Sequence, residues 1–472
     1  MMKNNKMKRF LIVILLLMAV VFAGCAKKEG ITMTDHISPI IDQEGADPYV
    51  FKHGENYYYT KTTGNSVKLI RSSGLTGIAA GEECVLYEPI SELEDLWAPE
   101  IFYLDDVWYV YFAASVPGEE MHHMYVLINE NEDPFVGEWR CEPVKGMDDK
   151  FAIDGTVLEL ESGRYFIWSG WEGYENVSQN LYLAEMISPT EVMEEKILIC
   201  EPEYDWEKQG DPLVNEGPEV IVRGNTINLV YSASGSWTDS YCLGLLTANI
   251  KDDLKSRESW VKKETPILRS QNDVWGPGHN SFTVSPDGKE DIIVYHAARW
   301  EGAGWNRSVR FGYVEFDESG KIMDIEPVSS EEHIKTPSGD AKRQIYSAET
   351  FSLSEGVELK ENAQSDSGAA AEGFLEFSET ASLQIECTKK EDALLHVYVK
   401  LKEFSDGEDL GSLQIKVNGE VYVEPIYPSA YFQPVSISVQ LKEGINEIVL
   451  SSETGGSTLV IDRVETQPVF AR

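Results

Sequence analysis

The sequence predicts an all-β chain in two parts, a five-bladed β-propeller followed by a β-sandwich of the jelly-roll kind. Three observations carry this prediction. An aromatic, β-branched run recurs five times, a short polar turn precedes each run by about ten residues, and after Tyr346 the pattern changes to alternation. Repeats of roughly 40–60 residues built from short strands are typical of propeller blades. Alternating apolar and polar residues are typical of a half-buried antiparallel sheet.

The five repeats are evenly spaced along the chain. The aromatic runs are YYYTKTT from Tyr57, WYVYFAAS from Trp108, YFIWSGW from Tyr165, INLVYSAS from Ile227 and IIVYHAA from Ile292. The preceding turns hold ADP with Asp47, WAPE with Glu100, IDG with Asp154, EGP with Glu216 and GPGH with His279. These polar residues are 53, 54, 62 and 63 residues apart. Because each blade presents its turn in the same place, we expect the five turns to converge around one axis.

The length of 472 residues exceeds one ordinary core, so two domains are expected. We place the propeller at 35–328, a polar linker at 329–343 and the sandwich at 344–472. The last part contains the alternating segments SLQIEC, LLHVYVKL, LQIKVNG and VSISVQL. They predict two sheets with about eight to ten strands.

The N-terminus has the pattern of a secretory signal. Four cations come first, at Lys3, Lys6, Lys8 and Arg9. A continuous apolar run from Phe10 to Ala23 follows, so residues 1–24 are predicted to be a signal peptide. Small residues before Cys25 resemble a bacterial lipobox, although Phe22 replaces the usual Leu. This pattern predicts a lipidated Cys25, a tether at 25–34 and a membrane-anchored, extracytoplasmic lipoprotein at the cell surface; simple secretion is the alternative.

The composition limits the kinds of partner and substrate that the protein is expected to bind. A formal charge of -40 argues against nucleic acid and against a polyanionic substrate. The 22 Tyr and 11 Trp suit carbohydrate, because a sugar stacks its C–H face on a ring while its hydroxyls need polar groups. The cysteines other than Cys25 are odd in number and widely spaced, which fits neither a disulfide framework nor a metal site. We expect mostly buried thiols at Cys84, Cys141, Cys200, Cys242 and Cys387.

Three of the five turns carry carboxylates that can do chemistry together. Asp47, Asp154 and Glu216 each lie beside a Gly or a Pro. Like charges in one cavity raise one another's pKa, so one carboxyl stays protonated while another is ionised. A protonated acid and a carboxylate base are what glycoside hydrolysis requires. Any one of these turns alone would be an ordinary Asp-Gly or Asp-Pro turn; their recurrence ahead of aromatic strands indicates the site.

The five motifs together resemble glycoside hydrolase family 43, five-bladed propellers that act on arabinose- and xylose-containing polymers. The resemblance covers roughly Gly45 to Pro327. It implies that Asp47 is the general base that activates water, Glu216 the general acid, and Asp154 the residue that orients the acid and tunes its pKa. The family inverts the anomeric centre, so the base and acid carboxyls are expected to lie roughly 6.5–9.5 Å apart.

Two further carboxylates need assignment. Glu219 also lies in the EGPE motif, but Glu216 directly precedes the Gly-Pro turn, as in the family, and is preferred as the acid. Glu219 is then a rim or structural carboxylate. Glu100 is expected to contact a sugar hydroxyl or to support a residue that does, with bracing of a neighbouring loop as the alternative.

Larger side chains complete the predicted site. Trp97 and Trp171 are candidates for the pocket wall, or they pack between blades. Of the two arginines in NRSVRFGYV, Arg307 rather than Arg310 is expected to point to the pocket and keep Asp47 ionised.

The resemblance also implies a bound Ca²⁺, which is the one cofactor expected. His279 would lie at the central channel beside the ion, with waters as its other main ligands, since calcium prefers oxygen. The alternative is a hydrogen-bonded core histidine. The C-terminal part resembles carbohydrate-binding modules of families 6 and 35, on YSAET, KVNG around Asn418, LKEGINEIVL and LVIDRVE. That resemblance implies a structural calcium shared by Glu349 and Asp462.

The C-terminal part lacks an obvious aromatic platform for sugar. Tyr427, Tyr431 and Phe432 are the candidates, with filling of the core as the alternative. The domain then either binds carbohydrate or only braces the propeller.

The runs EYDWEKQGDPLVNEGPEV, YSASGSWTDSYCLGLL and GPGHNSFTVSPDGKEDIIVYHA look like the exo-acting α-L-arabinofuranosidase branch of the family. The expected reaction is release of terminal arabinofuranose from arabinan or arabino-oligosaccharides, and the expected partner is an arabinose- or xylose-containing plant polysaccharide. A β-xylosidase is the main enzymatic alternative. A non-catalytic, glycan-binding surface lipoprotein is the other, and the presence of all three carboxylates with their turns argues against it.

Overall fold

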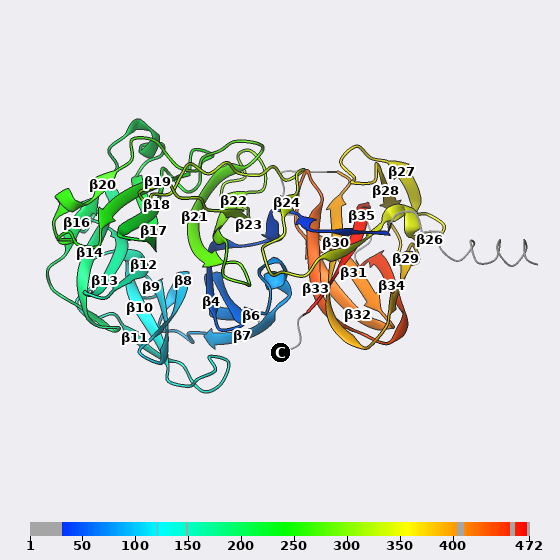
Figure 1. Ribbon diagram of the computed structural model, residues 1–472, viewed down its shortest axis with the longest axis horizontal. Coiled ribbons are helices and arrows are strands. Elements are labelled where there is room, and N and C mark those ends of the chain that lie inside the picture. Colours follow the sequence, from blue (N-terminus) through cyan, green and yellow to red (C-terminus); the bar gives the residue numbers. More distant parts are fainter. Residues whose placement is uncertain (1–30, 120, 148–149, 404–409, 454–457, 470–472) are drawn as a thin grey trace, which may run out of the picture.

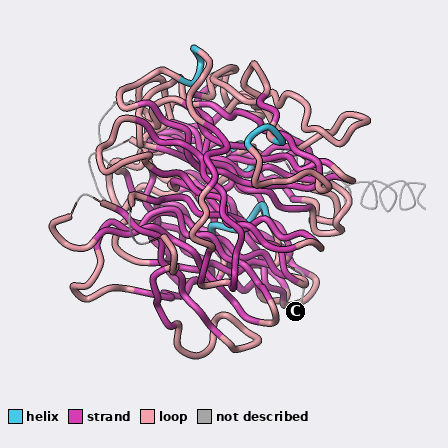
Figure 2. The backbone as a smooth tube through the Cα atoms, turned by 90° about the vertical axis from the view of Figure 1, so that its left-hand side faces the viewer, coloured by secondary structure: helices cyan, strands magenta, loops and turns pink. Residues whose placement is uncertain are grey.

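The structure is a computed structural model, and it describes residues 31–119, 121–147, 150–403, 410–453 and 458–469. The predicted signal peptide and Cys25 lie outside the described residues. Regular structure is almost entirely β, as predicted (Figure 2). The described helices are short 3₁₀ turns, at η1 (Leu75–Ala80), η2 (Asp205–Glu207), η3 (Arg257–Ser259) and η4 (Ala348–Thr350). In the described part of the chain, no helix has the length and apolar character that a membrane span requires.

The first part of the chain folds into successive antiparallel sheet units (Figure 1). The first unit contains β4 (Ala46–His53), β5 (Asn56–Thr62), β6 (Val67–Ser72) and β7 (Glu82–Tyr87). The second contains β8 (Glu94–Leu104), β9 (Val107–Ser115), β10 (His122–Asn129) and β11 (Arg140–Pro143). The third contains β12 (Ala152–Leu160), β13 (Gly163–Gly170) and β14 (Ser178–Ser188), and β14 also pairs with the short strands β15 (Glu191–Val192) and β16 (Ile197–Cys200).

Two more units complete this part. The fourth contains β17 (Leu213–Arg223), β18 (Thr226–Ala233), β19 (Cys242–Asn249) and β20 (Val261–Lys262). A short parallel pairing of β14 with β17 joins it to the third. The fifth contains β21 (Trp275–Val284), β22 (Asp291–Ala298), β23 (Arg307–Tyr313) and, from the start of the chain, β3 (Ile40–Asp42). The last unit therefore takes its outer strand from the N-terminal segment.

The first strands of the five units form a closed ring of contacts. β4 contacts β8, β8 contacts β12, β12 contacts β17, β17 contacts β21, and β21 returns to β4. The aromatic runs that the sequence repeats become the second strands, β5, β9, β13, β18 and β22. Their rings fill the space between units: Tyr58 packs 5.0 Å from Trp108, and Tyr111 packs 5.1 Å from Phe166, measured between ring centroids. Aromatic burial of this kind dominates core energetics.

Each first strand carries a β-bulge with one residue in the left-handed region. The ladder to the second strand shifts between Ala46 and Tyr49, and at the corresponding place in β8, β12, β17 and β21. The left-handed residues have closely similar φ values: Asp47 (53°), Ala98 (43°), Asp154 (56°), Gly217 (52°) and His279 (47°). Glycine adopts this conformation freely, and Asp and His tolerate it better than most residues, so the backbone strain is greatest at Ala98.

The bulges show which residues of the five turns are structurally equivalent, and this differs from the expected equivalence in two units. The polar residues of the turns were expected to be equivalent in all five units. Asp47, Asp154 and His279 are equivalent, but the residues equivalent to them in the second and fourth units are Ala98 and Gly217. Glu100 comes two residues after that position, and Glu216 comes one before it. The five units are therefore equivalent in backbone conformation, and the equivalent position does not always carry a polar side chain.

The second part of the chain forms two antiparallel sheets that share one core. The larger sheet contains β1 (Ile31–Thr34), β25 (Arg343–Ser347), β35 (Leu459–Pro468), β28 (Ala369–Gly373), β27 (Glu358–Glu361), β30 (Glu391–Leu401) and β33 (Gln433–Leu441). The smaller sheet contains β26 (Ser352–Leu353), β29 (Ala381–Cys387), β34 (Gly444–Ser452), β31 (Gly411–Val417) and β32 (Glu420–Ile426). Buried residues of both sheets pack together, among them Leu395, Ile415, Ile448 and Ile461.

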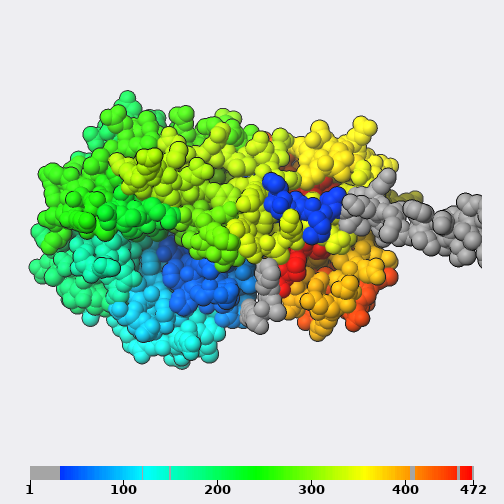
Figure 3. Space-filling model, in the orientation of Figure 1, coloured from blue at the N-terminus to red at the C-terminus, as the bar shows by residue number. Residues whose placement is uncertain are grey.

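Residues expected in connecting segments belong to sheets. Residues 31–34, expected in a tether, form β1 and pair with β25, so the N-terminal strand lies on the C-terminal part (Figure 3). Within the expected linker, β24 (Ile334–Lys335) pairs with β2 (His36–Ile37), and Arg343 begins β25. Edge pairing of this kind uses backbone groups, so a polar sequence does not reveal it.

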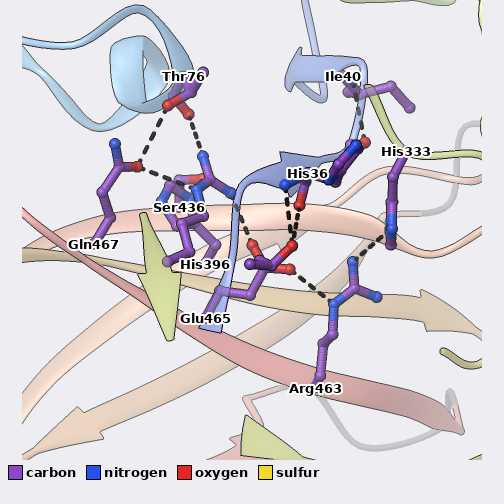
Figure 4. Close-up of polar contacts among 12 residues, drawn as sticks. His36, Ile40, Thr76, His333, His396, Ser436, Arg463, Glu465 and Gln467 are labelled. Carbon is purple, nitrogen blue, oxygen red and sulfur yellow. Dashed lines mark hydrogen bonds and ion pairs between the residues drawn. The ribbon is translucent and has the colours of Figure 1, made fainter. Parts of the chain in front are cut away.

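A buried polar cluster joins the two parts (Figure 4). Arg343 donates to Glu465 Oε2 at 2.9 Å and to the carbonyl oxygen of Thr76, in η1, at 3.1 Å. Arg463 donates to the other oxygen of Glu465 at 2.8 Å. Burial alone would raise the pKa of Glu465, but the two guanidinium groups lower it to about 2. Removing one partner would leave a buried charge uncompensated, so this junction requires all of them.

The five described cysteines are free thiols. Cys200, Cys242 and Cys387 are buried, and Cys84 and Cys141 are partly buried. Burial raises the pKa of the Cys200 thiol to about 11, so this thiol is protonated at neutral pH.

Candidate active site

Asp47 is the most heavily supported carboxylate at the ring of first strands. Thr62 donates its hydroxyl to Asp47 Oδ2 at 2.6 Å. On the other side, Oδ1 lies 3.1 Å from His279 Nδ1 and 3.7 Å from an Arg307 guanidinium nitrogen. The backbone N–H of Asp47 donates to His296 Nδ1 at 3.0 Å. Contacts from the first and fifth units therefore fix both the backbone and the carboxylate.

Burial favours the neutral form of the two histidines beside Asp47. Because His296 Nδ1 accepts the Asp47 N–H, its proton is assigned to Nε2. Burial, together with the positive charge of Arg307, lowers the pKa of His296 well below its usual value. Burial also lowers the pKa of His279, although Asp47 opposes the shift. His279 Nδ1 lies 3.1 Å from Asp47 Oδ1, which leaves Nε2 as the nitrogen on the other side of the ring.

Arg307 and Arg310 point to different places. Arg307 is buried, approaches Asp47 and donates to the carbonyl oxygen of Ser236 at 2.7 Å. Arg310 donates to Ser330 Oγ at 3.0 Å, at the end of the first part. The alternation along β23 thus places Arg307, and not Arg310, beside the carboxylate expected to be the base.

The surroundings of Glu216 keep its carboxyl partly protonated near neutral pH. Tyr241 donates its hydroxyl to Glu216 Oε1 at 2.8 Å. Burial raises the pKa of Glu216, the Tyr241 hydrogen bond lowers it, the charge of Asp47 raises it and Arg307 lowers it; the result is a pKa of about 7. A carboxyl with this pKa can donate a proton at neutral pH.

Asp154 connects the acid to the bulge of its strand. Its Oδ2 accepts the backbone N–H of Gly217 at 2.9 Å, one residue after Glu216. Burial, and then the charges of Glu216 and Asp47, raise the pKa of Asp154 well above its usual value. A Cβ added to Gly217 would lie 3.1 Å from the His279 ring, so glycine is required there by space as well as by φ.

A second pair of carboxyls lies two residues further along the first strands. Glu100 on β8 and Glu219 on β17 are both 5% exposed. Burial raises the pKa of Glu219 to about 8. Burial and the charge of Glu219 raise the pKa of Glu100 well above its usual value. Thr156 on β12 donates to Glu219 Oε2 at 3.5 Å. The raised pKa values favour the protonated form of this pair near neutral pH.

The two predicted wall tryptophans lie in different surroundings. Trp97 stacks on His122, with ring centroids 3.6 Å apart, and precedes Ala98, whose N–H donates to the same Thr62 that holds Asp47. Trp171 stacks on Phe151 at 4.2 Å. Trp171 belongs to a separate cavity of about 140 Å³ in the third unit, lined also by Met147, Lys150, Phe151, Ala152, Trp168, Glu172, Tyr182 and Lys196.

The residues expected to bind calcium make contacts within the protein. Within the described ranges, no group of three or more His, Cys, Asp and Glu could hold a metal ion. His279 offers one nitrogen, whereas calcium takes six to eight oxygen ligands. Asp462 accepts a hydrogen bond from Ser365 and pairs with Arg463. Glu349 lies in η4, 3.5 Å from Ser347 Oγ. No catalytic step is assigned to an ion.

The aromatic candidates of the C-terminal part are largely engaged within the protein. The ring of Tyr427 lies 4.3 Å from the guanidinium carbon of Arg299, which belongs to the first part. Phe432 is buried and lies 5.0 Å from Lys400 Nζ. Tyr431 is partly buried.

Sequence reasoning missed three side chains that hold the site together. Thr62, Tyr241 and His296 contact Asp47 or Glu216 directly. His296 and Thr62 lie in the aromatic runs IIVYHAA and YYYTKT. Such runs by themselves predict only buried strands. Tyr241 lies in a loop that has no distinguishing pattern.

Comparisons with known proteins identify the family of the chain. Residues 37–322 match the family described as "Glycosyl hydrolases family 43". The match covers more than half of the chain, which therefore belongs to family 43 of the glycosyl hydrolases.

Similar curated proteins are named as arabinofuranosidases. The "Extracellular exo-alpha-(1->5)-L-arabinofuranosidase" of Streptomyces avermitilis is 36% identical over 269 residues, which are 54% of this chain and 54% of that protein. The protein of the same name from Streptomyces chartreusis is 34% identical over 56% of this chain and 83% of its own length. The chain thus spans about half the length of the first of these relatives.

A similar solved structure is also named as an arabinofuranosidase. The α-L-arabinofuranosidase of Lactobacillus brevis is 33% identical and superposes with a TM-score of 0.59. The superposition covers 63% of this chain and 98% of that one.

Replacing Glu219 by Gln is expected to change the pH dependence of stability. Between the ordinary pKa of 4.5 and the folded pKa of about 8, the folded chain keeps a proton that the unfolded chain releases. Wild-type stability therefore falls as pH rises through this window, and Glu219→Gln removes the loss. The variant should gain on the order of 3 kcal/mol relative to wild type between pH 5 and pH 8. Urea denaturation at both pH values measures this.

Glu447→Gln, at an exposed carboxylate of β34, is the matched control and should follow wild type. Parallel stability curves for Glu219→Gln and wild type would show that Glu219 ionises normally in the folded protein.

Proposed function

We propose that this protein removes terminal α-L-arabinofuranosyl residues from arabinan or arabino-oligosaccharides. The supporting observation is the pairing of Glu216, whose pKa of about 7 keeps a proton available, with Asp47, a carboxylate held by Arg307, His279 and Thr62. The names of the similar proteins support arabinofuranose as the sugar.

The proposed reaction is a single inverting displacement. Asp47 accepts a proton from a water as that water attacks the anomeric carbon. Glu216 gives its proton to the glycosidic oxygen as the bond to that carbon breaks. Tyr241 occupies Oε1 of Glu216, so the transferable proton is placed on Oε2. Asp154 fixes the backbone beside the acid through Gly217 N–H. At the end Asp47 carries the proton and Glu216 is ionised, and exchange with solvent restores both.

We propose that the first part is a five-bladed β-propeller at 35–328 and the second a β-sandwich at 344–472. The closed ring of first strands supports the propeller, and two sheets with a common core support the sandwich. Because the larger sheet packs its polar face on η1 through Arg343, we propose that the second domain braces the first. Binding of carbohydrate by that domain remains a prediction from the resemblance.

We also propose an extracytoplasmic location. The two Streptomyces relatives are named extracellular, which supports export. The apolar run before Cys25 supports a signal peptide, and the lipobox-like pattern supports a lipid anchor on Cys25.

Conservative replacement of the base or the acid should remove activity from a folded protein. Asp47→Asn cannot accept the proton from water, and Glu216→Gln cannot donate one. Each variant is expected to lose about 10²–10⁴-fold in kcat on arabino-oligosaccharides. Product analysis on arabinan, arabinoxylan and xylo-oligosaccharides, with circular dichroism as the check on folding, measures this.

An active Asp47→Asn variant would contradict the assigned base. Release of xylose but not arabinose by wild type would replace the proposal by the β-xylosidase alternative. Binding of oligosaccharides without any hydrolysis would favour the non-catalytic alternative.

The alkaline limb of the pH profile should report Glu216. As pH rises through about 7 the acid loses its proton, and kcat/KM should fall. Tyr241→Phe removes the hydrogen bond that lowers this pKa, so the limb should move to higher pH. Profiles of kcat/KM for wild type and variant measure the shift, with Tyr174→Phe, at an exposed tyrosine, as control. A limb that stays in place or moves to lower pH would show that Tyr241 does not tune the acid.

For calcium, we propose an ion bound through His279 Nε2 and completed by water. Dialysis against a chelator should then lower the melting temperature and the activity, and added Ca²⁺ should restore both. The same dialysis tests the ion that the resemblance places at Glu349 and Asp462. Unchanged stability and activity after dialysis would remove calcium from the account.

A further inference from the structure

Two tryptophans are exposed beside the candidate active site. Trp305 is 68% exposed and Trp237 is 39% exposed. They lie in the loops that connect β22 to β23 and β18 to β19, in the fifth and fourth units. Tryptophan carries a large apolar surface that is mostly buried in soluble proteins, so two exposed indoles in neighbouring loops indicate a surface that binds a ligand.

The two loops are tied to each other. Trp305 Nε1 donates to Ser236 Oγ at 3.2 Å. The backbone N–H of Gly302 donates to both carboxylate oxygens of Asp239, each at 3.0 Å. The donors all belong to the β22–β23 loop and the acceptors to the β18–β19 loop, and the first of these bonds holds the Trp305 ring in place.

Two glycines make room for the Trp237 ring. A Cβ at Gly235 would lie 2.7 Å from the Trp237 ring, and one at Gly210 would lie 3.2 Å from it. Two segments of bare backbone therefore receive one edge of the indole, and the remainder is exposed to solvent. Ordered aromatic side chains of this kind bind a ligand at low entropic cost.

The loops are continuous with the catalytic groups. The carbonyl oxygen of Ser236 accepts from Arg307, which lies beside Asp47. The loop of Trp237 ends at Tyr241, which holds Glu216. The tryptophans thus lie on loops bonded to the acid and to the arginine beside the base.

We propose that Trp237 and Trp305 bind the sugar on the leaving side of the bond that is cleaved. This inference rests on the proposed function. The general acid protonates the glycosidic oxygen of the leaving sugar, so the next ring of the chain must lie near the acid. A neutral pentose ring presents a C–H face that stacks on indole, and its hydroxyls face water. The surface selects oligosaccharide over a substrate with a single sugar.

The test compares two substrates that share the cleaved sugar. Arabinotriose has a second ring for the tryptophans, and methyl α-L-arabinofuranoside has none. Trp305→Ala should lower kcat/KM about tenfold on arabinotriose and less than about twofold on the methyl glycoside. Trp305→Phe keeps an aromatic face and should lose less on arabinotriose than Trp305→Ala. Phe377→Ala, at a 67% exposed ring of the second part, should match wild type on both substrates.

Equal losses on both substrates would overturn the proposal, because they would show that Trp305 acts only by supporting Arg307. Unchanged activity on both would overturn it as well. If wild type cleaves xylosides instead, the proposed sugar fails, and the same ratio measured with xylotriose and methyl β-D-xyloside decides the leaving-side surface. A protein that cleaves neither class has no leaving sugar, which also overturns it.

Discussion

The structure depends on one repeated backbone constraint, a left-handed residue within a bulge on each of the five first strands. Asp47, Ala98, Asp154, Gly217 and His279 share φ values between 43° and 56°. A bulge twists its strand and re-aims the side chains around it. The closed ring of first strands then brings Asp47, Asp154 and His279 together, with Glu216 one residue before Gly217. Strained backbone of this kind persists only where its surroundings fix it, as Gly217 N–H and the His296 ring do here.

Electrostatics follow from this convergence. Carboxyls forced into a buried ring cannot all be ionised, and burial raises the pKa values of Asp154, Glu216 and Glu219. Asp47 is contacted by Arg307, His279 and His296. Burial thus leaves Glu216, with a pKa of about 7, able to donate a proton near neutral pH.

Much of the site could be predicted from the sequence, because its chemistry lies in short turns. The spacing and the aromatic runs predict the all-β class, and the motifs resemble those of the family. The strand register that separates Arg307 from Arg310 comes only from the structure. The equivalence of the five turns was wrong in two units, since φ decides equivalence and Ala98 carries no polar signal. Strand β1 and the contacts of Thr62, Tyr241 and His296 come from tertiary packing, which local sequence does not encode.

The central claim is that the bulges hold Asp47 and Glu216 on separate strands, β4 and β17, so that water and acid work on opposite faces of one sugar. The anomeric form of the first product tests it most directly. Proton NMR during hydrolysis of an arabino-oligosaccharide should show β-L-arabinofuranose first, before mutarotation. Initial release of the α-anomer would mean retention, which requires carboxyls only about 5–5.5 Å apart, and would contradict the account.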